Sequence, residues 1–148
     1  MKRLIALLIF ASSAFGYGAP TTLLDLVKKS ECIVVAKVTD VDDAQLAHAK
    51  VLETWKGDVA ESIEFSAAKS SYACDIADAH RGETVVLFLT RNSPREPLAI
   101  AHFGRGRMTL DQQQNVAFDD VTIAPRKEMT GSIPLAELRR LVQLMVGG

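Results

Sequence analysis

The sequence predicts a mainly β protein: a small five-stranded barrel with one helix before it and one helix after it. Three observations predict this class. Several short runs are rich in β-branched residues, turn residues separate these runs, and helical periodicity occurs only near the two ends. No βαβ alternation and no internal repeat is visible in the sequence. Closing the strands into a barrel is the simplest arrangement for a chain of this size.

The central strands are the clearest elements. Cys32–Val41 is rich in β-branched residues, which predicts a largely buried strand. Glu83–Thr90 is almost continuously apolar, which predicts burial on both of its faces. The run His48–Lys56 alternates, with Ala49, Val51, Glu53 and Trp55 on one face and Lys50, Leu52, Thr54 and Lys56 on the other. Further strands are expected at Ser62–Ala67, Leu98–His102, Arg107–Leu110 and Val116–Phe118.

Both expected helices have recognisable ends. Thr21 or Thr22 can cap a helix over Leu23–Ser30. The C-terminal pattern becomes helical from Ser132, and Pro134 suits a first helical turn. Gly147 ends this second helix. Its apolar stripe consists of Leu135, Leu138, Leu141, Val142 and Met145.

The N-terminus has the features of a secretory signal peptide. Lys2 and Arg3 are followed by the apolar run Leu4–Ala11 and then by small residues, which favours cleavage after Gly16. The apolar run is far shorter than the roughly 20 residues that a membrane anchor needs. We therefore expect residues 1–16 to be a signal peptide. Residues 17–148 would form a single domain that acts in the periplasm or outside the cell.

The charge balance argues against nucleic acid as a partner. The whole chain has a net charge of −1, and loss of Lys2 and Arg3 with the signal peptide would change it to −3. A mildly acidic protein has no general attraction to nucleic acid or to anionic membranes. We also expect no membrane span in residues 17–148, because no later segment is long and apolar enough.

Cys32 and Cys74 are the two cysteines of the chain. In an oxidising compartment such a pair favours a disulfide over two buried free thiols. The bridge would close a loop of about 42 residues and contribute up to about 4 kcal/mol in the chain-entropy model. That is a large share of the net stability of a small domain.

The order of these elements resembles a known module. The second strand ends in Trp55–Asp58 (WKGD), and Cys74 lies in a loop before Arg81–Glu83 (RGE) and the run VVLFL. Over about residues 23–111 this resembles the bacterial secreted form of the netrin-like module, which also forms the inhibitory half of tissue inhibitors of metalloproteinases. The resemblance implies an OB-fold-like Greek-key barrel that is secreted and acts by binding rather than by turnover.

One departure from those inhibitors concerns their chemistry. Their mature chain begins with a cysteine whose free amine and carbonyl bind the zinc of the protease. Here Tyr17–Glu31 would precede Cys32, so its amine is part of a peptide bond. The resemblance therefore extends to the fold, and the zinc-binding mechanism is not expected without a second cleavage.

Few residues suggest catalysis or metal binding. His48, His80 and His102 lie in different expected elements, and no close histidine pair or cysteine pair has metal-ligand spacing. Cys74 and His80 are the most metal-like pair, but a disulfide would remove Cys74 as a ligand. We therefore expect no metal, no cofactor and no catalytic site.

The loop around Cys74 also carries acidic residues. Asp75, Asp78 and Glu83 could supply a carboxylate pair, although turn and cap residues in a solvated loop explain them more simply. Trp55 is expected in the core or at the barrel rim rather than on a binding surface.

One cluster is a candidate binding face. Arg91 and Arg95 flank the loop after the strongest strand, and Arg105 and Arg107 bracket the next turn beside Phe103. OB-fold barrels bind ligands through a strand face and adjacent loops, so these residues could bind an anion. The alternative is a solvated rim that keeps strand edges from pairing with other chains.

Three functions are compatible with this sequence. The first is a secreted, non-enzymatic binding module whose partner is a protein, with a peptidase or an acidic glycan as more specific options. The second is a small hydrolytic or metal-dependent enzyme, which requires two of the histidines to meet Asp75, Asp78 or a free Cys74. The third is a structural envelope protein whose helix Leu135–Val146 docks on a larger assembly.

Overall fold

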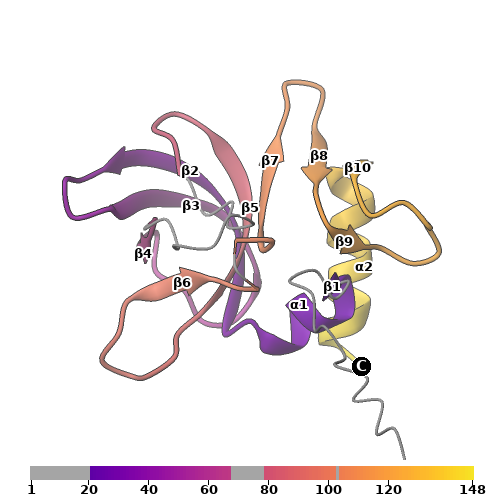
Figure 1. Ribbon diagram of the computed structural model, residues 1–148, viewed down its shortest axis with the longest axis horizontal. Helices are drawn as coiled ribbons and strands as arrows, with labels where there is room; N and C mark the ends of the chain where they lie inside the picture. The colour runs from indigo at the N-terminus through magenta and orange to yellow at the C-terminus, as the bar shows by residue number, and fades with distance from the viewer. Residues whose placement is uncertain (1–20, 68–78, 103) are drawn as a thin grey trace, which may run out of the picture.

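The computed structural model describes residues 21–67, 79–102 and 104–148. The chain there is mainly β, with one helix near each end, as the sequence predicts (Figure 1). The helices are α1 (Leu23–Lys29) and α2 (Leu135–Val146). The long strands are β2 (Cys32–Val41), β3 (Leu46–Lys56), β4 (Ser62–Ser66) and β5 (Thr84–Thr90). The short strands are β1 (Thr21–Thr22), β6 (Leu98–Ile100), β7 (Arg107–Leu110), β8 (Asn115–Phe118), β9 (Val121–Thr122) and β10 (Gly131–Pro134).

Five strands of the described chain close into a barrel. They follow the order β5-β2-β3-β4-β6, and pairing of β6 with β5 closes the ring. The β4–β6 pair is parallel and the other four pairs are antiparallel. This arrangement confirms the predicted small OB-fold-like barrel.

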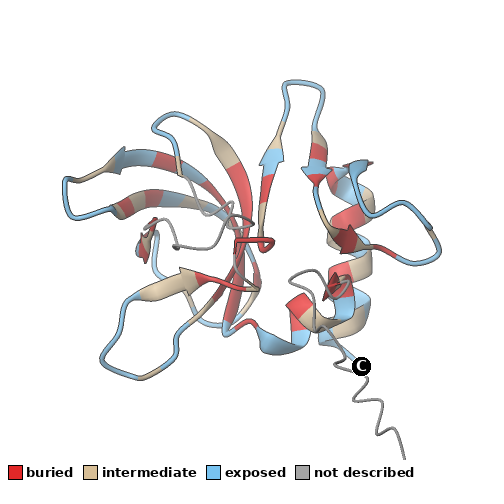
Figure 2. Ribbon diagram, viewed as in Figure 1, coloured by how far each residue is buried: buried red, intermediate tan, exposed pale blue. Residues whose placement is uncertain are grey.

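Strands β2 and β5 have apolar residues buried on both faces, and they separate two cores. In β5 the side chains of Val85, Leu87 and Leu89 point into the barrel. The alternate residues, Val86 and Phe88, point into a second core outside it. The same division holds along β2, which explains why neither strand alternates between polar and apolar residues (Figure 2).

The second core is covered by the C-terminal part of the chain and by both helices. The sheet continues from β5 through β7, β8 and β10, and α2 follows β10 directly. The apolar stripe of α2 supplies Leu135, Leu138 and Val142 to this core. Helices α1 and α2 lie side by side next to the barrel (Figure 1). The apolar face of α2, which a structural envelope protein would use for docking, is therefore largely buried against the protein's own core.

Local signals fix the start of α1. The hydroxyl of Thr22 accepts a hydrogen bond from the amide of Asp25, and the Asp25 carboxylate accepts one from the Thr22 amide. This reciprocal capping box selects Thr22 over Thr21 as the N-cap. At the other end of the helix, Lys56 of β3 donates to the carbonyl of Val27 at 2.7 Å and ties α1 to the barrel.

The start of α2 differs from the expectation. Residues Gly131–Pro134 form strand β10 against β8 instead of a first helical turn, and Pro134 is the N-cap. Proline fits there because Ile133 is the residue that fills the core, while the missing amide of Pro134 falls at the strand end. The pair β1–β9 was also not predicted, because two-residue strands leave no periodicity in the sequence.

Candidate binding groove

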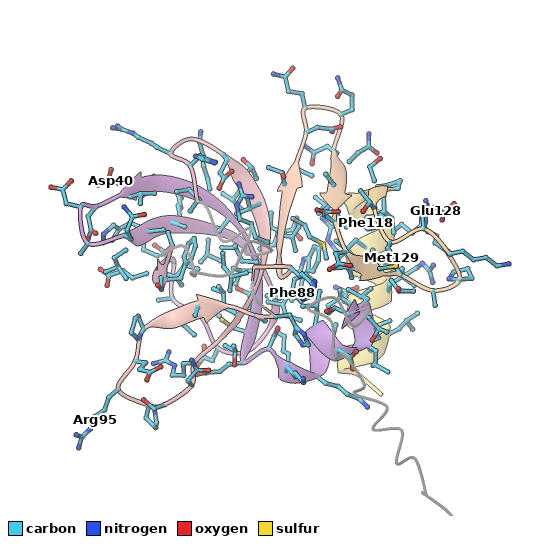
Figure 3. All side chains as sticks on the ribbon, in the orientation of Figure 1. Asp40, Phe88, Arg95, Phe118, Glu128 and Met129 are labelled. Atoms are coloured by element: carbon cyan, nitrogen blue, oxygen red, sulfur yellow. The ribbon has the colours of Figure 1, made fainter. Side chains whose placement is uncertain are left out.

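The arginines of the expected binding face do not gather in one place. Arg91 donates to Glu31 at 3.1 Å, near the end of β5. Arg107 forms a two-pronged ion pair with Glu83, near the start of the same strand. Arg95 is exposed at the tip of the loop between β5 and β6 (Figure 3). Phe103 lies outside the described residues.

Arg105 is the most buried of these arginines. Only 7% of its surface is exposed, and its Nε donates to the carboxylate of Asp120 at 2.6 Å. Three of the four arginines therefore neutralise carboxylates of the protein itself. Sequence spacing does not reveal such pairs, because the acidic partner of Arg91 is 60 residues away.

No disulfide is seen among the residues that the structure describes. Cys32 is a buried free thiol at the start of β2. Burial raises the pKa of this thiol, and the nearby Glu31 carboxylate adds to the effect while Arg91 opposes it. Cys74 lies outside the described residues, so its pairing with Cys32 stays a prediction.

Each histidine has different surroundings. The two ring nitrogens of His48 face Asp42 at 3.5 Å and Glu64 at 3.3 Å. The amide of His80 donates to the carboxylate of Glu83, and His102 lies in the loop between β6 and β7. Asp75 and Asp78, which the enzyme hypothesis requires, lie outside the described residues. Among the residues that are described, no group of three His, Cys, Asp or Glu side chains is arranged to hold a metal ion.

A groove forms where β7 leaves β5. The two strands pair only from Val85 to Leu87, and the β7–β8 hairpin then continues away from the start of β5. The cavity in this fork has a volume of about 480 Å³. Its walls are residues 82–84 before and within β5, residues 110–112 and 114 of the hairpin, and two neighbouring residues of β3.

The floor of the groove is apolar. Val35 of β2 and Leu135 of α2 are buried beneath it, and Leu110 of β7 is partly buried. Leu52 of β3 stands at the edge with 51% of its surface exposed. A partner that covered Leu52 would therefore remove apolar surface from water on both sides of the contact.

The rim of the groove carries charge. The carboxylate of Glu53 binds Arg139, and that of Glu83 binds Arg107. Hydrogen bonds from Arg139, and a weaker contribution from Trp55, lower the pKa of Glu53 although partial burial opposes them. Asp111 accepts a hydrogen bond from the Asn115 amide but forms no ion pair with any described residue. It therefore leaves one negative charge without a counter-charge at the hairpin tip.

The sequence did contain one signal of this groove. Within the run His48–Lys56, Leu52 is the single apolar residue on the face that also carries Lys50, Thr54 and Lys56. A lone apolar residue on a polar strand face is common and by itself predicts no site. The fork between β5 and β7 has no local signature, because it depends on where the pairing of two strands stops.

Two further findings concern the whole chain. No helix in the described ranges is both long and apolar enough to cross a membrane. Comparison with protein-family models and with curated proteins finds no match to this chain.

Proposed function

We propose that the protein is a non-enzymatic binding module of the periplasm or the extracellular space, which docks a protein partner in the groove between β3 and the β7–β8 hairpin. The observation that carries this proposal is the exposed Leu52 beside an apolar floor. An exposed apolar residue next to a concave surface with a polar rim is typical of an interaction site. The signal peptide that the sequence predicts at residues 1–16 supports the proposed location.

The chemistry of the groove favours a particular kind of partner segment. An apolar side chain would pack on Leu52 and Leu135, and a neighbouring lysine or arginine would meet Asp111. The carboxylates of Glu53 and Glu83 are already paired, so they add polarity without attracting a second cation strongly. A protein segment with an apolar anchor followed by a basic residue fits these properties best.

This partner could be a peptidase, as the resemblance to netrin-like inhibitors implies. The start of β2 and the groove are different places in the fold, and Cys32 is buried inside its strand. Binding through the groove therefore needs no free cysteine amine. The internal pairing of Arg91, Arg105 and Arg107 favours a protein partner over an acidic glycan.

Selection of peptides from a displayed random library on the purified full chain tests the proposal. Dissociation constants of selected peptides would then be measured for the wild type, Leu52→Asp and the control Leu144→Asp. Leu144 is 64% exposed on α2 and does not line the groove, so it matches Leu52 in exposure only. We expect selected peptides to combine an apolar and a basic residue. Leu52→Asp should weaken them at least about tenfold, since one buried leucine contributes about 1.5–3 kcal/mol.

Equal weakening by both variants, or no enriched peptide, would overturn the groove as the docking site. A third variant, Asp111→Asn, should weaken only those peptides that carry the basic residue. Mass mapping of the protein exported by its producing cell should find residue 17 as the first residue. A retained N-terminus would overturn the proposed location without affecting the groove.

A further inference from the structure

Pairing between β5 and β7 stops one residue before the two strands end. The last pair of this ladder is Val85 with Thr109. Continuing the register would pair Thr84, the first residue of β5, with Leu110, the last residue of β7, but that pair is not formed. Both residues line the groove, and the β7–β8 hairpin projects away from β5 beyond this point (Figure 1). The groove therefore begins where the sheet stops pairing.

The backbone of Thr84 points toward β7 rather than toward β2. In an antiparallel sheet, the amide and carbonyl of one residue face one neighbouring strand, and those of the next residue face the other. The Glu83 carbonyl accepts a hydrogen bond from the Val38 amide of β2 at 2.9 Å. The Phe88 amide instead donates to the carbonyl of Gly106, just before β7, at 2.8 Å. Odd-numbered residues of this segment therefore face β2, and even-numbered residues, including Thr84, face β7.

The backbone of Leu110 faces the same gap from the side of β7. Its neighbour Asp111 donates from its amide to the carbonyl of Asn115, across the β7–β8 hairpin, at 2.9 Å. By the same alternation, the amide and carbonyl of Leu110 face β5. Because the pair is missing, the Thr84 amide and the Leu110 carbonyl have no backbone partner among the residues that the structure describes. The gap therefore presents one hydrogen-bond donor and one acceptor.

The acidic side chains around the gap bind other groups. The carboxylates of Glu53 and Glu83 bind arginines, and the carboxylate of Asp111 accepts from the Asn115 amide at 2.8 Å. Thr84 and Leu110 are both half-buried, and backbone groups in such places normally have a hydrogen-bond partner. A ligand that covered this end of the groove would therefore have to supply one acceptor and one donor of its own.

We propose that the partner segment in this groove is an extended peptide, which accepts a hydrogen bond from the Thr84 amide and donates one to the Leu110 carbonyl. This inference rests on the proposed function of the groove. Successive residues of an extended chain present their backbone groups in opposite directions, so one residue can bind β5 and the next can bind β7. A helical segment is disfavoured, because its amides and carbonyls already bind one another.

The backbone bonds and the side-chain contacts have different roles in this arrangement. Main-chain hydrogen bonds add affinity for any extended sequence, and side-chain pockets select among sequences. Here the apolar side chain of the peptide packs on Leu52 and its basic residue faces Asp111. Thr84 and Leu110 therefore fix the register of the peptide, which brings these two side chains to their places.

Ester replacement in a selected peptide tests the donor that the partner supplies. An ester keeps the shape of the peptide bond but has no N–H group, so each position can be replaced in turn and the dissociation constant measured with the purified full chain. One position should weaken binding about tenfold, because the Leu110 carbonyl is then covered without a donor. The esters on either side of it are matched controls and should weaken binding much less.

The donor on the protein side is tested with one variant and with the wild type. Thr84→Pro removes the amide hydrogen, and proline is tolerated at the first residue of a strand. It should bind selected peptides about tenfold more weakly than Thr84→Val, which loses the hydroxyl group but keeps the amide. In the wild type, a saturating peptide should slow hydrogen exchange of the Thr84 amide about tenfold more than that of the Val85 amide, which faces β2.

The possible failures can be told apart. Peptides that depend on Leu52 but tolerate every ester would show binding through side chains alone, which overturns the extended backbone pairing and leaves the groove intact. If no peptide depends on Leu52, the groove and this inference are both wrong. A Thr84 amide that is as well protected as Val85 in the free protein would mean that its donor is already bound, and this overturns the inference alone. If Thr84→Pro does not fold, the esters and the exchange rates decide.

Discussion

Arg139 of α2 and Glu53 of β3 are joined by two hydrogen bonds, from Nε at 2.8 Å and from Nη2 at 2.7 Å. The guanidinium also lies 5.9 Å from the centre of the Trp55 ring, and Trp55 Nε1 donates to the same carboxylate at 2.9 Å. Trp55 itself is buried in the outer core. One carboxylate thus connects the C-terminal helix, a barrel strand and the single tryptophan.

Replacing Arg139 with methionine should lower the free energy of unfolding by about 1 kcal/mol. The pair is two-pronged but about a third exposed, so screening by solvent limits its contribution. Urea unfolding followed by Trp55 fluorescence measures the change. Arg140→Met, at the exposed neighbouring position, should change the stability little. A double-mutant cycle with Glu53→Gln should show a coupling energy, and independent effects of the two substitutions would contradict the pairing.

Glu53 should also contribute to the acid sensitivity of stability. Hydrogen bonds from Arg139 lower its pKa in the folded protein. Its contribution is therefore complete above the ordinary value of 4.5 and is lost as pH falls through the lower folded value. Unfolding free energies measured from neutral pH down to acid should decline less steeply for Glu53→Gln than for the wild type. Parallel curves for the two proteins would contradict this assignment.

Gly57 and Gly82 both have a left-handed backbone but differ in the room for a Cβ atom, so alanine substitutions at the two positions separate the cost of backbone strain from the cost of steric crowding. Gly57 (φ 84°) has no room for a Cβ atom, which would lie 2.8 Å from the Glu31 carbonyl oxygen, whereas Gly82 (φ 87°) has nothing within 4 Å. Gly82→Ala should cost about 1–2 kcal/mol through backbone strain alone. Gly57→Ala should cost a further 1–3 kcal/mol or so, because backbone atoms must move. If thermal or urea unfolding gave equal losses of unfolding free energy for the two variants, the atoms around Gly57 would move aside at no cost, which would contradict this prediction.

Cys32 should react slowly while the protein is folded. In Cys74→Ser it is the single thiol, it is buried, and burial raises its pKa, so little thiolate is available for reaction. A thiol reagent should modify it quickly only in denaturant. Rapid modification of the folded variant would mean that the start of β2 opens readily.

The predicted bridge between Cys32 and Cys74 has its own test. Protein recovered from the oxidising compartment should weigh two hydrogen masses less than the same protein after reduction, and reduction should lower its melting temperature. Two free thiols in the exported protein would rule out the bridge. Cys32→Ser in the reduced protein serves as the control for loss of the thiol alone.

The strands that carry the barrel could be predicted because their residues have strong local signals. Cys32–Val41 and Arg107–Leu110 are found with the expected bounds, and the continuous apolar run in β5 correctly indicated burial on both faces. The ends of strands beside turns shifted by one or two residues, as for β3, which begins at Leu46.

The functional surface could not be predicted in the same way. Arg105 and Arg107 look like free cations in the sequence, yet each meets a carboxylate that only the tertiary fold brings close. Leu52 is unremarkable until the divergence of β5 from β7 creates a groove beside it. Local sequence encodes strands and caps, whereas ion pairs and grooves arise from distant segments.

The burial of β2 and β5 on both faces ties the two cores into one cooperative unit. Unfolding of the barrel would expose the apolar side chains on one face of β2 and β5, and unfolding of the second core would expose those on the other face. Neither half can therefore melt and leave the other half with a complete interior. The central amides of these two strands should be the last to exchange, and they should do so at a rate set by global unfolding.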